Sequence, residues 1–182
     1  MKKILVGILG VAIIFTLFGC QRVKGKIESI KKPDHEKIEN ARGILDKILE
    51  HIADTDRELS FKDGKLVDSE LGVPHFDIVP FSEIKHFNAK EVVDGFIVRP
   101  VVDVDNPKLL IVVEAVDKKA SESLVKAMAK VHSDQYEKFK EAGIQAKYLI
   151  GNNKTIRQGD HLLYVTWEGS KDIVKVFERY VR

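Results

Sequence analysis

The sequence predicts an α+β fold: an antiparallel sheet built from β-hairpins, with helices packed mainly on one face, preceded by an N-terminal amphipathic helix. Two observations lead to this prediction. Runs of β-branched residues pair across turn signals, which is typical of hairpins. Between and around them lie segments whose apolar residues recur every three or four positions, which is typical of helices that bury one face.

The first helix is predicted from Asp34 to Leu59, where Pro33-Asp34 is a helix-start signal. Gly43 inside this segment costs about 1 kcal/mol relative to alanine and suggests a close packing contact. The apolar stripe of the helix consists of Ile38, Ala41, Leu45, Ile48 and Ile52.

Short extended segments are expected next. Asp63-Gly64 is a turn signal that would join 59–62 to 65–67 as a small hairpin. Two prolines and a glycine forbid a long helix over 71–80, so short extended pieces are predicted there.

The strongest strand signals lie between residues 92 and 116. A hairpin is predicted from 92–104 and 109–116, with Asp105-Asn106-Pro107 in its turn. Gly95 is expected to form a β-bulge, and Pro100 to mark an edge or another bulge.

A long helix is predicted from Lys118 to Ala142, capped by Asp117 and followed by Gly143. After it, 144–150 and 161–167 are expected to form a second hairpin with a long loop. A last helix, capped by Ser170, ends the predicted domain.

The first twenty residues follow a different pattern. Lys2 and Lys3 precede the uncharged apolar run Ile4–Phe18, and Gly19 and Cys20 follow it. A basic start, an apolar run and small residues before a cleavage point are typical of a secretory signal. The run is shorter than the roughly 20 apolar residues of most spanning helices.

This start resembles the signal peptide of bacterial lipoproteins, with Leu17-Phe18-Gly19-Cys20 as the lipobox. The resemblance implies cleavage between Gly19 and Cys20, and a diacylglyceryl group on the Cys20 sulfur. It also implies a lipid-anchored protein on the extracytoplasmic face of the cell membrane. An uncleaved anchor, or a secreted protein with an accidental cysteine, remain as alternatives.

The expected organisation is a signal peptide (1–19), a lipid-anchored basic tether (20–33) and a single α+β domain (34–182). Over 21–32 the tether has five basic residues against Glu28 alone, so it either touches anionic headgroups or is a solvated spacer. In layout the chain is similar to small Bacillus-type lipoproteins.

Charge and cysteine content exclude several functions. Without Lys2 and Lys3 the chain has 28 basic side chains and 28 acidic ones, which argues against a nucleic-acid-binding protein. Cys20 is the sole cysteine, so a domain acylated there has no disulfide, thiol nucleophile or cysteine zinc cluster. No cofactor is expected.

The candidate metal ligands are His75, Asp77 and His86. Alternate residues of an extended segment point the same way, so His75 and Asp77 could share a site. Two histidines and a carboxylate would form a catalytic type of zinc set. The alternative is that these are ordinary surface or loop histidines, because the spacing matches no known zinc motif.

The candidate partner-binding residues are Tyr164 and Trp167, since these residue types dominate interface hot spots. Strand alternation places them on opposite faces, so either Trp167 is an outer contact or it belongs to the core and Tyr164 is half-exposed.

We therefore expect a non-catalytic binding or scaffolding module of the cell envelope, with an envelope protein or a wall polymer as its partner. No GxSxG elbow or phosphate-binding loop is present, and no enzyme activity is expected. Two alternatives stay open: a small-ligand or metal-binding lipoprotein, and an envelope hydrolase whose site has no recognisable motif.

Overall fold

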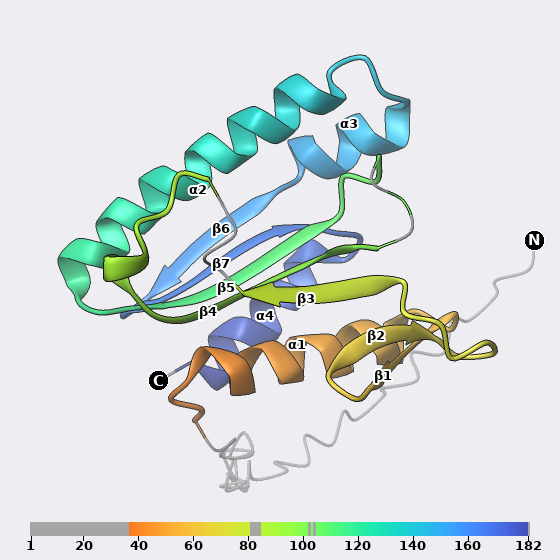
Figure 1. Cartoon of the computed structure of the whole chain (residues 1–182), viewed down its shortest axis with the longest axis horizontal. Helices are drawn as coiled ribbons and strands as arrows, with labels where there is room; N and C mark the ends of the chain where they lie inside the picture. The colour runs from red at the N-terminus through yellow and green to blue at the C-terminus, as the bar shows by residue number, and fades with distance from the viewer. Residues whose placement is uncertain (1–36, 81–84, 102, 104, 182) are drawn as a thin grey trace, which may run out of the picture. The chain divides into compact units, whose positions relative to one another are not determined.

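The computed structural model describes residues 37–80, 85–101, 103 and 105–181. The predicted signal peptide, the cleavage point at Gly19 and Cys20, and the basic tether lie outside the described residues. Residues His35–Arg182 form one compact unit. Figure 1 shows the arrangement of its helices and strands.

The centre of the unit is a five-stranded antiparallel sheet in the order β3-β4-β5-β7-β6. The prediction of an α+β fold with an antiparallel sheet is confirmed. A separate hairpin of β1 (Leu59–Lys62) and β2 (Lys65–Asp68) stands beside it. The main strands are β3 (Phe76–Pro80), β4 (Val92–Pro100), β5 (Leu109–Ala115), β6 (Lys154–Gln158) and β7 (His161–Thr166).

Helices cover both faces of the sheet (Figure 1). Helices α1 (Ala41–Thr55) and α4 (Ser170–Tyr180) pack on one face, and α2 (Lys118–Phe139) packs on the other. The prediction that helices lie mainly on one face holds for α1 and α4 and is wrong for α2. The reason is visible in β5, where Leu110 to Val113 are all buried, because a continuous apolar strand needs cover on both sides.

Side-chain caps fix where the first two long helices begin. Asn40 Oδ1 accepts a hydrogen bond from the Gly43 amide at 2.7 Å, so α1 begins at Ala41 rather than Asp34. Gly43 does mark a close contact: a Cβ there would lie 2.6 Å from Ile38 Cγ2. Asp117 caps α2 as predicted, accepting from the Ala120 amide at 2.7 Å.

The first hairpin follows its turn chemistry. Asp63 and Gly64 both have positive φ, as a type I′ turn requires, and β1 and β2 pair as predicted. In β4 the register shift lies between Val92 and Asp94, so the predicted bulge at Gly95 is displaced to its neighbours. A short 3-10 helix, η2 (Ala89–Glu91), leads into β4, and Pro100 ends it.

The second hairpin differs from the prediction. Ile144–Gly151 is a helix, α3, and the partner of β7 is β6, joined to it by a tight turn at Gly159-Asp160. Ile144 is 89% exposed while Leu149 and Ile150 are buried, which is a helical rather than an alternating pattern. The last helix starts one residue earlier than expected, because Gly169 is its N-cap and Ser170 is its first residue.

The chain enters the unit beside its C-terminal end. Lys37 Nζ donates to the backbone oxygens of Arg179 (3.0 Å) and Val181 (2.7 Å), and the Ile38 amide donates to the Tyr180 oxygen at 2.8 Å. This entry end holds the start of α1 and the end of α4. The opposite end holds the β4–β5 connection and the end of α2.

Within the described ranges, no helix has the length and apolar character needed to cross a bilayer.

Candidate functional site

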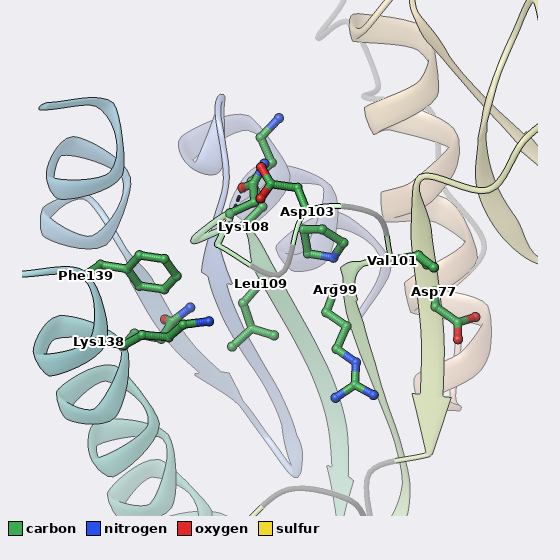
Figure 2. Close-up of a pocket in the computed structure, with 11 residues that line it drawn as sticks. Asp77, Arg99, Val101, Asp103, Lys108, Leu109, Lys138 and Phe139 are labelled. Atoms are coloured by element: carbon green, nitrogen blue, oxygen red, sulfur yellow. Dashed lines mark hydrogen bonds between the residues drawn. The ribbon is translucent and has the colours of Figure 1, made fainter. Parts of the chain in front are cut away.

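A groove with a volume of about 470 Å³ opens on the α2 face, at the end of the sheet opposite to Lys37. Its floor comes from the start of β3, the end of β4 and the start of β5, and its wall comes from the last turns of α2. Figure 2 shows Lys138 and Phe139 projecting from α2 toward Leu109, with Arg99 and Asp77 on the far side.

The sheet register places opposite charges side by side on this floor. Asp77 of β3 and Arg99 of β4 are direct cross-strand partners, so their Cβ atoms lie about 5 Å apart. Both side chains lie on the same face of the sheet as Val79 and Ile97, which belong to the core that packs against α2. Asp77 is half-buried and its Oδ1 accepts from Lys65 Nζ at 2.9 Å. Arg99 is exposed.

The α2 wall combines an aromatic ring with a second cation. The Phe139 side chain is buried, and Lys138 Nζ lies 4.8 Å from the centre of its ring. Lys138 Nζ also lies 4.0 Å from Asp105 Oδ1. Leu109 is half-buried on the floor opposite this wall, so an apolar strip separates Lys138 from the Asp77 and Arg99 pair.

A polar network under the wall fixes its position. Tyr164 is fully buried, and its hydroxyl donates to Gln135 Oε1 at 2.5 Å. Gln135 Nε2 in turn donates to the Pro107 oxygen at 3.1 Å, as does Thr166 Oγ1 at 2.7 Å. Burial raises the pKa of Tyr164 well above its usual value, so the hydroxyl keeps its proton. The network holds α2 against the β4–β5 connection.

Lys108 borders the groove, but its ammonium belongs to the other face. It lies 2.9 Å from Glu168 Oε2 and over the rings of Trp167 (5.3 Å) and Phe76 (5.8 Å). The charged side chains that line the groove on the α2 face are therefore Arg99, Lys138 and the nearby carboxylates.

The predicted metal ligands do not form a metal site. His75 Nε2 lies 3.4 Å from Asp68, Asp77 pairs with Lys65, and His86 Nε2 lies 2.7 Å from Asp134 Oδ2. The hydrogen bond with His86 lowers the pKa of Asp134. Across the described residues, no three histidine, cysteine or carboxylate side chains gather as metal ligands. Three separate pairings replace the predicted zinc set.

The predicted partner-binding residues are both in the core. Trp167 is 5% exposed and packs on Phe76, with ring centres 4.4 Å apart. Tyr164 lies on the opposite face, as strand alternation predicted, but it is fully buried rather than half-exposed. The role of outer contact is therefore wrong for both residues, because helices cover both faces of β7.

The groove residues Arg99, Lys138 and Phe139 were not singled out from the sequence. They lie on separate elements that only the fold brings together. The available signal was Arg99 itself, a charged residue that ends the apolar run 96–98 of β4 just before Pro100.

Scans of family models, of curated proteins and of solved structures found no match to this chain.

Proposed function

We propose that the protein is a lipid-anchored lipoprotein whose domain is a non-catalytic binding module on the extracytoplasmic face of the cell membrane. The start of the sequence carries this proposal: two lysines, an uncharged apolar run, and Leu17-Phe18-Gly19-Cys20 in the place of a lipobox. An envelope protein or a wall polymer is the proposed partner.

The geometry of the domain supports this arrangement. The chain enters the unit at Lys37, which is tied to the end of α4, and the groove opens at the other end of the sheet. Residues 20–36 reach at most about 60 Å when extended. A tether of this length would let the domain reach partners beyond the lipid headgroups.

Metabolic labelling with a palmitate analogue tests the anchor. The wild-type protein should incorporate the label and fractionate with membranes, and Cys20→Ala should do neither. Protease added to intact wall-stripped cells should degrade the domain. Equal labelling of both forms, or a domain shielded from the protease, would contradict the proposal.

Cross-linking in living cells tests the partner. The anchored protein is compared with Cys20→Ser, which is expected to lack the anchor. Reproducible capture of one envelope protein or of wall polymer by the anchored form alone is expected. Capture by neither form would count against the interaction module.

A second candidate function is binding of a small organic ligand in the groove. One observation favours it: the cavity has the size of ordinary ligand sites and combines an apolar strip with convergent charges.

A further inference from the structure

We infer that the groove binds amino acids or short peptides that carry a free carboxylate, a free ammonium and an apolar side chain. This inference rests on the proposed small-ligand function of the same groove. The arrangement of charged and apolar side chains around the cavity indicates the class of ligand.

Arg99 is the expected carboxylate ligand. Its guanidinium presents parallel N–H donors that match the two oxygens of a carboxylate, and the side chain lies exposed on the groove floor. Lys138 contributes a second positive charge from the opposite wall. An anionic group between the two walls would be attracted by both.

Asp77 is the expected ammonium ligand. In the described part of the chain, Asp77 contacts Lys65 Nζ at 2.9 Å and the Ile78 amide at 3.1 Å, in both cases through Oδ1. Oδ2 is then the oxygen that can accept from a ligand ammonium. Because Asp77 and Arg99 are direct cross-strand partners, they suit the closely spaced charges of an amino acid, whereas Lys138 on the opposite wall would take the carboxylate of a short peptide held at Asp77 by its amino end.

Leu109 and Phe139 provide the apolar contact beside these charges. A ligand side chain lying between them would remove apolar surface from water on both sides. The balance of charges also selects against a simple polyanion. Asp77, Asp103 and Asp105 surround the two cations and would repel a phosphate or sulfate, whereas a zwitterion meets both signs.

The test is calorimetric titration of the full-length protein in detergent micelles. The probes are leucine, the tripeptide alanyl-leucyl-alanine, the same tripeptide with an amidated carboxyl end, and the same tripeptide with an acetylated amino end. Leucine or the unmodified tripeptide should bind with a Kd of about 1 mM or below. Each capped form should bind about tenfold more weakly, because it lacks one charge-assisted contact. Comparing leucine with the tripeptide separates a free amino acid from a peptide end.

Variants locate the binding site. Arg99→Gln and Asp77→Asn should each weaken binding of the preferred probe about tenfold. Arg179→Gln is the matched control, since Arg179 is an exposed arginine on the last turn of α4 at the entry end, and it should bind like the wild type. Circular dichroism of each variant confirms folding.

No binding of leucine or the tripeptide would overturn the inference, as would equal binding of capped and uncapped forms. Wild-type affinity in Arg99→Gln would overturn it as well. These failures are distinct from failure of the proposed anchor. If the wild-type protein takes up no palmitate label, the proposed anchor is wrong, and the titration result is unaffected. If the protein is labelled but binds no probe, the anchor is supported and the inferred ligand is wrong.

Discussion

The two faces of the sheet are covered in different ways. On one face, α1 packs over β4 and β5 and α4 over β6 and β7, and the side chains between them are almost entirely apolar. On the other, α2 packs mainly over β5, β6 and β7. There the interior includes a tyrosine, a glutamine and a threonine in one hydrogen-bonded network.

Because of this difference, we expect one face to contribute mainly to the stability of the fold and the other to ligand binding. Two helices close the first face with a continuous core, which contains more buried apolar side chains than the core under α2. On the second face α2 does not cover the start of β3 and the end of β4, and the groove opens there. Substitutions on the first face should therefore change the free energy of unfolding, and those at the groove should change ligand binding.

The largest expected effect is at Phe177, which is fully buried between α4 and the sheet. Phe177→Ala should lower the free energy of unfolding by about 3–5 kcal/mol, because it leaves a cavity that the surrounding helices cannot fill. Phe139→Ala on the groove wall should cost about 1–3 kcal/mol, since water can enter the open side. Urea denaturation measures both values. Equal losses would contradict the comparison of the two faces.

The network on the α2 face is tested by Tyr164→Phe. Removing the hydroxyl leaves Gln135 Oε1 without its buried donor and should cost about 1–3 kcal/mol. Tyr148→Phe is the control, because Tyr148 is exposed, and it should leave the unfolding midpoint unchanged. If Tyr164→Phe is as stable as the wild type, the network does not hold α2 in place.

His161 makes the first face sensitive to pH. Its ring is buried, its Nε2 donates to the Glu39 oxygen at 3.1 Å, and burial lowers its pKa despite the nearby Glu114 and Asp160. The folded protein therefore favours neutral His161, whereas the unfolded chain takes up a proton near pH 6.5. Stability from this residue is present above about pH 6.5 and is lost as the pH falls below it.

Denaturation on both sides of this pH measures the effect, with His161→Gln as the comparison. Glutamine retains a donor for the Glu39 oxygen and cannot titrate. The variant should lose less stability on acidification than the wild type. An equal loss in both proteins would assign the pH dependence to other groups.

Local patterns predicted much of this fold from the sequence. The Asp63-Gly64 turn, the Asp117 cap and the long apolar run of β5 each determine their own structure, and all three are confirmed. The prediction of a strand at 144–150 is wrong because Ile144, Tyr148 and Ile150 fit a period of two, although the segment forms a helix. The true edge strand, β6, has a single apolar residue, Ile156, and so gave almost no signal.

The groove could not be predicted in the same way. Asp77, Arg99 and Lys138 come from two strands and a helix, and they meet only through the β3–β4 register and the packing of α2. Neither the strand register nor the packing of α2 can be predicted from the spacing of residues along the sequence. The sequence favoured Tyr164 and Trp167 because of their residue types, but cover on both faces of β7 buries them. Residue type alone therefore pointed to the core rather than to the groove.

The smallest expected effect on stability is at the groove itself. Arg99 is exposed at the end of β4, so Arg99→Gln should change the free energy of unfolding by no more than about 0.5 kcal/mol. The same variant is expected to lose ligand binding, so stability and binding would separate at one residue. Thermal unfolding without ligand measures the first quantity. A loss of several degrees would mean that Arg99 holds β3 and β4 together, and the groove would then be part of the structural core rather than a site added to it.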